Sequence, residues 1–273
     1  MGSPELHFLG HSTVRVELAG RTVLTDPVLA PTIGALRRVV PLPDPAAWAG
    51  VDLVLISHLH GDHLHIPSLR MLGRDVRVLV PRGAGAWLRG RGFPNTRELS
   101  AGETLSDGDL RITGVRAEHS GHRWGPRSTH GPATESLGYL LESPGAGTVY
   151  VSGDTGLFDG MAVLAARAVD VALLPVWGWG PSLGPGHLDP VTAADAVALI
   201  RPRVAVPVHW GTLTVAGMTV VPSPLRARMR RLLVDPPRSF ATEVAARGLP
   251  TRVVVTEPGS RVLLPPPPSL AAA

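Results

Sequence analysis

The chain has 273 residues, 44% of them hydrophobic and 18% charged, which is typical of a globular protein with a sizeable core and excludes a disordered chain. It contains no cysteine, so disulfides and thiolate metal ligands are excluded, and His, Asp and Glu are left as candidate ligands for a metal. The 26 basic residues, all of them arginine, exceed the 22 acidic residues by four, an excess too small to predict a nucleic-acid partner.

Hydrophobic patterning along the chain predicts alternating strands and helices. Three short apolar or alternating runs, 5–10, 13–18 and 22–27, come first, and a proline-rich loop follows over 27–50. Residues 51–57 then form a continuous apolar run, as in a strand that is buried on both faces. Further strands are predicted at 76–81, 110–117, 136–143, 148–154, 169–176, 203–209, 252–257 and 261–264, and helices at 83–90, 157–167, 190–200, 224–234 and 239–247.

The helix at 190–200 has the clearest signals. Asp189 is a typical N-cap, and Pro190 fits the first helical position. Because no linker is long enough to separate domains, we predict a single α/β domain over 1–265 and a disordered tail over 266–273. The apolar face expected for the helix consists of Val191, Ala194, Val197 and Ala198.

The segment HLHGDH, residues 58–63, follows the apolar strand and concentrates metal-binding side chains. His58 and His60 are two positions apart, so in an extended chain both rings project to the same side. Asp62 and His63 follow Gly61, where the chain can turn sharply. Imidazole and carboxylate groups are ligands for zinc and similar ions, so we predict a metal site rather than a polar surface loop.

This motif resembles the signature of the metallo-β-lactamase-fold hydrolases, and the resemblance extends along nearly the whole chain. It implies a four-layer αββα sandwich of the metallo-β-lactamase type, with the metal site at one edge between the two sheets. Asp26, in LTDP, matches the acidic residue that braces the histidine-rich loop in that family. His119, Asp154 and His209 match further family residues, and each lies at the end of a predicted strand.

The resemblance implies a dinuclear centre with two divalent ions, expected to be zinc, with manganese or iron as alternatives. Such ions lower the pKa of a shared water, and the hydroxide formed attacks carbon or phosphorus without a side-chain nucleophile. The implied ligands are His58, His60 and His119 for one ion, Asp62, His63 and His209 for the other, and Asp154 as the bridge between them.

The flanking segments 8–29, 152–161 and 186–212 are similar to the branch containing N-acylphosphatidylethanolamine-hydrolysing phospholipase D and the ascorbate-6-phosphate lactonases. This similarity implies cleavage of a small phosphodiester or a lactone or ester. His187 matches a histidine that faces the active site in this branch. Its expected role is to bind the substrate's anionic group or to protonate the leaving group, with stiffening of its loop as the alternative. We therefore expect Asp62, Asp154 and His187 to be the catalytic residues.

Other side chains near the predicted ligands have weaker signals. Trp124, Trp177 and Trp179 are candidates for the walls of a substrate pocket, with core packing as the alternative. His11, in GHST, is expected to be a structural residue or to contact the metal ligands without binding metal itself, as is Asp26. His65 is expected one turn into a helix and facing solvent.

The expected partner is a small-molecule substrate, anionic or an ester, and no nucleic acid is expected. The arginine-rich segment 226–231 is interpreted as a solvated helix face, with contact to a phosphate group or a membrane surface as the alternative. No apolar run reaches the roughly 18 to 20 residues of a membrane-spanning helix, and no secretory signal is visible, so a cytoplasmic location is expected. Two other functions stay open, a nuclease of the same fold and a metal- or ligand-binding protein without turnover.

Overall fold

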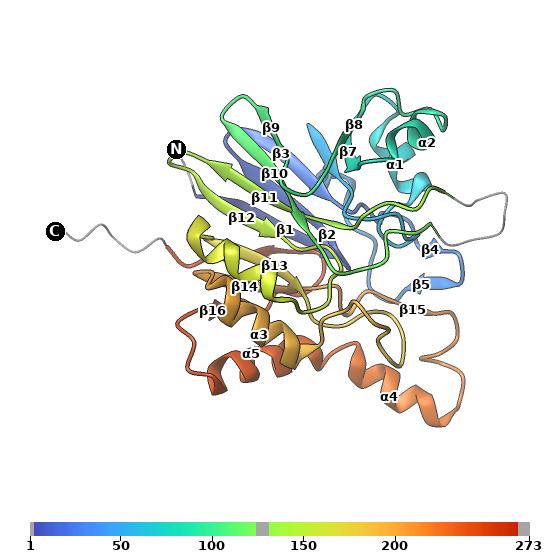
Figure 1. Ribbon diagram of the computed structural model, residues 1–273. Coiled ribbons are helices and arrows are strands. Elements are labelled where there is room, and N and C mark those ends of the chain that lie inside the picture. The colour runs from blue at the N-terminus through green and yellow to red at the C-terminus, as the bar shows by residue number, and fades with distance from the viewer. Residues whose placement is uncertain (1–2, 124–130, 267–273) are drawn as a thin grey trace.

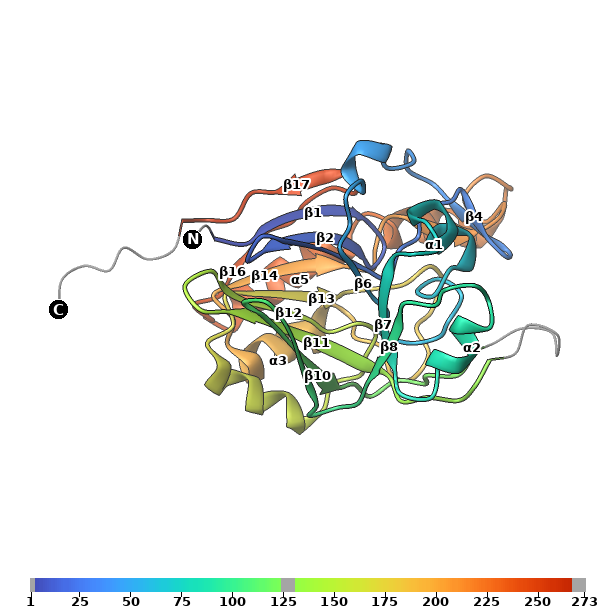
Figure 2. The ribbon, with the colours of Figure 1, turned by 90° about the horizontal axis from the view of Figure 1, so that it is seen from above.

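The computed structural model describes residues 3–123 and 131–266, and the structural statements below refer to these residues. Two seven-stranded sheets pack face to face, and helices cover the outer face of each (Figures 1 and 2). This αββα arrangement confirms the predicted fold class. Of the predicted tail, residues 267–273 lie outside the described part of the chain, and so does Trp124.

The first sheet carries the strand that leads into the histidine-rich loop. Its strands β3, β6, β7 and β8 are parallel, and α1 (Ile66–Leu72) and α2 (Gly85–Arg89) cover its outer face. In spatial order the strands are β17 (Ser260–Val262), β1 (Glu5–Gly10), β2 (Thr13–Leu18), β3 (Arg21–Thr25), β6 (Leu53–Leu55), β7 (Arg77–Pro81) and β8 (Thr96–Leu99).

Strand β6 is buried on both faces, as its continuous apolar run predicts. Leu53 and Leu55 belong to the core between the two sheets, whereas Val54 packs in the core beneath α1 and α2. The alternation follows from the period of two in a strand, which sends successive side chains to opposite faces. Apolar residues at every position therefore fix β6 in the middle of the sandwich, with its carboxyl end at the edge where the histidines follow.

The second sheet contributes four parallel strands to the same sandwich. Its outer face is covered by α3 (Pro190–Ile200), α5 (Pro236–Ala246) and η3 (Asp159–Arg167), a 3₁₀ helix within the predicted helix 157–167. In spatial order the strands are β16 (Arg252–Val253), β14 (Val204–Val208), β13 (Val171–Pro175), β12 (Gly147–Val151), β11 (Leu137–Ser143), β10 (Leu110–Arg116) and β9 (Thr104–Asp107).

Helix α3 begins as predicted but turns a different face to the core. Asp189 caps it by accepting a hydrogen bond from the Thr192 backbone N–H at 2.8 Å, and Pro190 is the first helical residue. Val191 is 46% exposed, so its predicted place in the apolar face was wrong. The helix is rich in alanine and apolar on most sides, so hydrophobic spacing alone does not define its buried face. The buried residues are Ala193, Ala194, Ala196, Val197 and Ile200.

The proline-rich segment 27–50 is more ordered than predicted. It contains β4 (Thr32–Ile33), β5 (Leu36–Arg38) and the 3₁₀ helix η1 (Pro45–Ala47). Strand β5 pairs with β15 (Leu213–Val215), which is almost 180 residues away in the chain, so local sequence does not reveal the pairing. The helix α4 (Pro224–Leu232) follows β15. Among the described helices, none is long and apolar enough to cross a membrane.

Candidate metal centre

The predicted ligands meet at one edge of the sandwich. His58 follows β6, His119 follows β10, Asp154 follows β12 and His209 follows β14. Strands β12, β13 and β14 are parallel, so their carboxyl ends lie at the same edge. The two sheets are joined there by backbone hydrogen bonds, including one from the Leu137 N–H to the Ser57 carbonyl oxygen at 2.9 Å. The fold therefore gathers groups that are far apart in sequence.

One cluster of three nitrogen ligands consists of His58, His60 and His119. Their ligand atoms all lie within 4.8 Å of one another, and His60 Nδ1 is 3.1 Å from His119 Nε2. Two nitrogens that bind one tetrahedral ion at about 2.0–2.1 Å lie about 3.3–3.4 Å apart. The observed spacing is thus close to that of two ligands of a single ion.

A second cluster lies beside the first. His63 Nε2 and His209 Nε2 are 3.2 Å apart, and each is 3.2 Å from Asp154 Oδ2. Asp62 Oδ2 lies 3.9 Å from both ring nitrogens. Asp154 also groups with His58 and His63, and with His119 and His187, as possible ligand sets. Asp154 is therefore shared between the two clusters.

Two buried atoms at the centre have no hydrogen-bond partner among the described residues. They are Nε2 of His58, which is fully buried, and Oδ1 of Asp154, which is 2% exposed. A buried polar atom left unsatisfied costs about 1–3 kcal/mol. A cation bound between the clusters would satisfy both atoms, so the residues present fit a metal.

In His119 and His209 the ring nitrogen that points away from the centre is bound to a backbone carbonyl. His119 Nδ1 lies 2.7 Å from the Gly186 oxygen, and His209 Nδ1 lies 2.6 Å from the Trp177 oxygen. A carbonyl only accepts, so each Nδ1 carries the hydrogen, and in the neutral ring Nε2 keeps its lone pair for the centre. Gly186 has φ +74, and a Cβ there would come within 2.7 Å of the Glu118 oxygen, so this support for His119 requires glycine.

Asp26 holds the histidine-rich loop, residues 57–65, from below, as the family resemblance implies. Its Oδ2 accepts a hydrogen bond from Ser57 Oγ at 2.6 Å and lies 2.8 Å from His63 Nδ1. Its Oδ1 accepts from the Ser57 N–H at 2.7 Å. The carboxylate is 1% exposed, so these donors replace water almost completely.

The two clusters differ in their protonation. Burial lowers the pKa of His60 to about 4, with help from His119, and lowers the pKa of His58 well below its ordinary value. Burial is the largest influence on His63 and His209 and acts to lower the pKa of each, but the neighbouring carboxylates, Asp154 foremost, together outweigh it and raise both. The metal-free protein thus favours neutral imidazoles in the first cluster, whereas the carboxylates of the second cluster favour protons on its histidines.

His11 contacts the predicted ligand Asp62. Its Nε2 is 3.0 Å from Asp62 Oδ2, and its ring centroid is 3.9 Å from that of His209. Burial lowers its pKa to about 3, and it groups with Asp62, His63 and His209 as a possible ligand set. His11, Asp26 and His209 have φ of 56, 35 and 62, in the left-handed region that costs a non-glycine residue about 1–3 kcal/mol.

His187 and Trp179 line a small cavity beside the centre. His187 Nε2 lies 3.5 Å from Asp154 Oδ2, and Trp179 Nε1 donates to Asp62 Oδ2 at 3.1 Å. The cavity has a volume of about 120 Å³, and Leu183 and His209 are among its other walls. Trp177 is not part of this wall, because its ring packs against the main core and its Nε1 donates to the Gly180 oxygen.

His65 was predicted to face solvent, and this prediction was wrong. The residue is 8% exposed and is the N-cap residue of α1, with Nδ1 2.8 Å from Ser68 Oγ. Helix α1 begins at Ile66, one residue later, so His65 still has an extended backbone and its ring turns inward. It belongs to the packing of the loop rather than to the ligand clusters.

Arg123 supports the histidine-rich loop and was not expected from the sequence. Its Nη1 donates to the carbonyl oxygens of Leu59 at 3.0 Å and Leu64 at 2.6 Å, on either side of the turn. Tyr139 adds a hydrogen bond from its hydroxyl to the Ile56 oxygen at 2.7 Å. Neither residue stands in a motif, since both act on backbone carbonyls that carry no side-chain signal.

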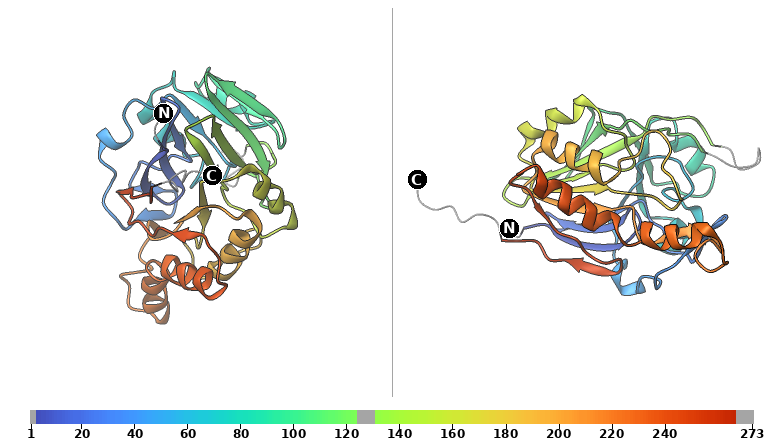
Figure 3. Two further views of the ribbon diagram at one scale, coloured as in Figure 1. Left: turned by 90° about the vertical axis from the view of Figure 1, so that its left-hand side faces the viewer. Right: turned by 90° about the horizontal axis from the view of Figure 1, so that it is seen from below.

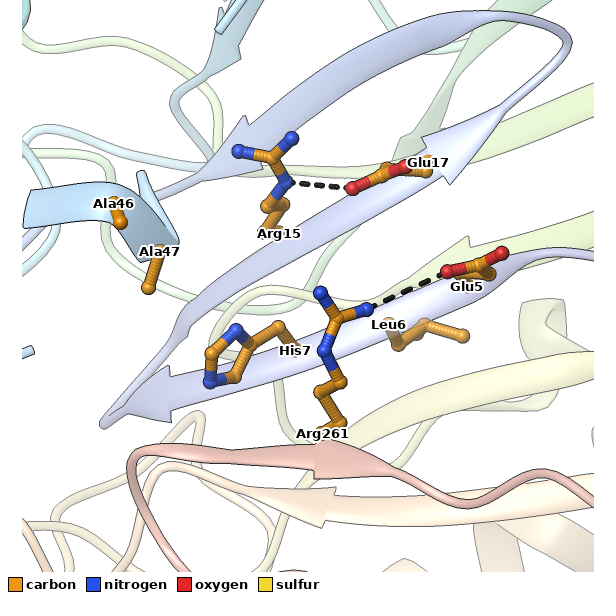
Figure 4. Close-up of a pocket in the computed structure, with 8 residues that line it drawn as sticks. All are labelled: Glu5, Leu6, His7, Arg15, Glu17, Ala46, Ala47 and Arg261. Atoms are coloured by element: carbon orange, nitrogen blue, oxygen red, sulfur yellow. Dashed lines mark hydrogen bonds and ion pairs between the residues drawn. The ribbon is translucent and has the colours of Figure 1, made fainter. Parts of the chain in front are cut away.

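A separate hollow between β1, β2, β17 and η1 contains a histidine and four charged residues (Figure 4). Arg15 pairs with Glu17 at 2.9 Å, and Arg261 lies 3.5 Å from Glu5. His7 binds the Gly259 oxygen at 2.9 Å. The charged groups pair with one another and lie away from the buried clusters, so the hollow is not a candidate catalytic site.

Comparison with known proteins agrees with the geometry of the edge site. The family model described as the beta-lactamase superfamily domain matches residues 21–210, so the chain belongs to the metallo-β-lactamase superfamily and is, by homology, a metal-dependent hydrolase. More narrowly, it belongs to the UPF0173 metal-dependent hydrolases. It is 33% identical to the member MK1542 of Methanopyrus kandleri over 261 residues, covering 92% of this chain and 96% of that protein.

Three further proteins are similar to most of this chain. Rv0906 of Mycobacterium tuberculosis, an uncharacterized protein, is 33% identical over 93% of this chain and 67% of its own length. The solved structure of Igni18, a metallo hydrolase from Ignicoccus hospitalis, is 25% identical with a TM-score of 0.69, covering 95% of this chain and 97% of that one. A possible metal-dependent hydrolase from Veillonella parvula shares the fold, with a TM-score of 0.73 at 17% identity and coverage of 97% and 100%.

Proposed function

We propose that this protein is a dinuclear metal-dependent hydrolase that cleaves a small phosphodiester or a lactone or ester. The observation that carries the proposal is the pair of buried clusters, in which ring nitrogens 3.1–3.2 Å apart surround unsatisfied atoms of His58 and Asp154. Zinc fits this set of nitrogen and oxygen ligands, as do manganese and iron. Two such ions, when bound, supply the Lewis acidity that makes water a nucleophile near neutral pH.

The chain's own residues divide the remaining tasks. Asp154 links the two positions, because its carboxylate is 3.2 Å from His63 Nε2 and His209 Nε2 and has a ligand atom within 4.8 Å of one of His58. The proposed ligands are His58, His60 and His119 at one position and Asp62, His63 and His209 at the other.

His187 stands between the centre and the cavity. Its Nε2 is 3.5 Å from Asp154 Oδ2, and its side chain is 22% exposed. From this place the ring reaches a substrate oxygen, which it binds or to which it donates a proton as the leaving group departs.

The cavity supports a small substrate. Its volume of about 120 Å³ is well below the roughly 300–1,000 Å³ of pockets for drug-sized ligands. Among the described residues its walls include no arginine, so an anionic group there would depend on His187 and on bound metal. Trp179 and Leu183 provide apolar contact. Within the family, we propose chemistry like that of the phospholipase D and lactonase branch.

Elemental analysis combined with a hydrolysis screen tests the proposal. We expect about two divalent ions per chain after reconstitution and turnover of members of a phosphodiester and lactone panel. Asp154→Asn should lose both metal and turnover, since it removes a charged oxygen from the shared ligand. Asp170→Asn is the matched control, because Asp170 precedes β13, away from the ligands, where it accepts from the Thr148 N–H at 2.9 Å and lies 3.5 Å from Arg203 Nε.

Fewer than about one ion per chain after reconstitution would refute the dinuclear site. Full metal loading with no turnover on either substrate class would favour the binding protein without catalysis. Cleavage of RNA or DNA above a metal-free control would instead favour the nuclease.

A further inference from the structure

The segment 216–234, which contains α4, carries a concentrated positive charge. It contains Arg226, Arg228, Arg230 and Arg231 and no acidic residue, whereas the rest of the chain has equal numbers of arginines and acidic residues. The whole net charge of +4 thus equals the charge of this one segment. None of the four guanidinium groups forms an ion pair with a described carboxylate, and Arg230 only donates to the Thr219 oxygen at 3.2 Å.

The same segment exposes apolar side chains. Val220 is 66% exposed and Val221 58%, just before α4, while Leu225 in its first turn is 43% exposed. Val234, after the helix, is 48% exposed. Only Met229 of α4 is buried, so the helix is fixed by one side and presents most of its surface outward. Figures 1 and 3 show α4 at the periphery, beyond α3 and α5.

We propose that segment 216–234 docks the protein on anionic membrane surfaces. Exposed valines and leucine enter the interfacial region of the bilayer, and the arginines contact lipid phosphates. Such a helix lies on a membrane and does not cross it, which agrees with the absence of a spanning helix among the described residues. This binding surface is additional to the proposed hydrolase and does not depend on it.

Charge and composition favour a membrane over other occupants. A second copy of the chain would bring the same four arginines against themselves in a two-fold contact, which like charges oppose. The segment has no Trp, Tyr or Phe to stack on bases of single-stranded nucleic acid. Apolar side chains beside unpaired arginines match instead a surface with anionic headgroups over hydrocarbon.

Vesicle flotation with the full-length protein tests the proposal. We expect binding to vesicles of equimolar phosphatidylcholine and phosphatidylglycerol, little binding to phosphatidylcholine alone, and weakening by salt. Each arginine near an anionic surface contributes about five-fold to partitioning, so Arg228→Gln with Arg231→Gln should weaken binding by about 25-fold.

Matched variants separate local contact from overall charge. Arg97→Gln with Arg252→Gln removes the same charge from exposed sites on β8 and β16 and should change binding less than about two-fold. Val220→Asp should weaken vesicle binding by more than about five-fold, whereas Val163→Asp, at an equally exposed valine (66%) on η3, should not. Circular dichroism and thermal unfolding confirm that each variant is folded.

Results of three kinds would overturn the proposal. One is equal binding to neutral and anionic vesicles, or equal loss in both arginine pairs. Another is a salt-sensitive complex with RNA or DNA that Arg228→Gln with Arg231→Gln abolishes while vesicle binding is absent. The third is a dimer in sedimentation velocity that Val220→Asp converts to monomer in the absence of lipid.

Discussion

Replacing Asp26 by asparagine should weaken metal binding at one position and leave the other unchanged. The carboxylate accepts from the Ser57 N–H at 2.7 Å through Oδ1, and Oδ2 faces Ser57 Oγ at 2.6 Å and His63 Nδ1 at 2.8 Å. Asparagine has one acceptor oxygen, which either serves the Ser57 N–H or faces the ring. In the first case its amide donates toward His63 Nδ1, and the ring must carry its proton on Nε2 instead.

A proton on His63 Nε2 occupies the lone pair that faces Asp154 and His209, each 3.2 Å away. Loss of such a supporting partner costs about 10- to 100-fold in metal affinity, or roughly 1.4–2.8 kcal/mol. The loss of the charge-assisted bond itself destabilises the metal-free fold by about 2–3 kcal/mol, a fall in Tm of roughly 4–12 °C.

Titration with zinc against a chromophoric chelator, followed by elemental analysis, measures the effect of Asp26→Asn. We expect two binding steps in both proteins. In the variant the step at Asp62, His63 and His209 should be weaker, and the step at His58, His60 and His119 should be unchanged. Asp52→Asn is the control, because Asp52 is half-buried and accepts from the Thr22 N–H at 2.8 Å, away from the centre. Unchanged affinity at both steps would refute the tautomer argument, and equal weakening of both would mean that the fold as a whole had suffered.

Three further outcomes follow from the protonation of the site and its supports. Metal uptake at neutral pH should release no proton from His60, because burial lowers its pKa to about 4. It should release one proton from His63, because Asp154 acts against burial to raise the pKa of that ring. Calorimetry in buffers of different ionisation enthalpy distinguishes the two binding steps, and equal proton release in both would contradict this prediction. Arg123→Gln should weaken metal binding about ten-fold by freeing two loop carbonyls, and a chelator competition with unchanged affinity would argue against it. Burial, with Arg123, lowers the pKa of His65 to about 4, so the unfolded chain takes up the proton at a higher pH than the folded protein does. The free energy of unfolding therefore falls as pH decreases from about 6.5 to about 4. Urea unfolding of metal-free His65→Gln should show a smaller fall over this range, and an identical fall would contradict the role given to His65.

The sequence predicts strongly buried elements well and marginal ones poorly. Strand β6 is apolar at every position, and α3 has both a capping aspartate and a first-turn proline, so each is evident locally. Strands β8 and β9 carry polar residues at the end of their sheets, and β5 pairs with a strand far along the chain. Local patterning contains no information about such partners, which is why these strands were not predicted.

The residues of the site likewise differ in how far the sequence predicts them. The histidine-rich loop is evident as a motif because its ligands are consecutive, whereas His119 and His209 required a family resemblance to single them out. The supports that act through backbone atoms had no signal at all. Arg123 donates to two carbonyl oxygens, and Trp177 contributes its own carbonyl to His209 rather than its ring to the pocket.

The charge and protonation of the ligands affect how strongly each of the two positions binds metal. The first cluster offers three neutral imidazoles, and the second offers Asp62 together with histidines whose pKa carboxylates raise. Carboxylate charge strengthens attraction for a divalent cation, but protons on His63 and His209 compete with it. The competition weakens as pH rises, so the second position gains affinity with pH while the first, already deprotonated, changes little above neutrality. The order in which the positions fill should therefore depend on pH, and an affinity ratio between the two steps that is constant from pH 6 to pH 9 would contradict this account of the site.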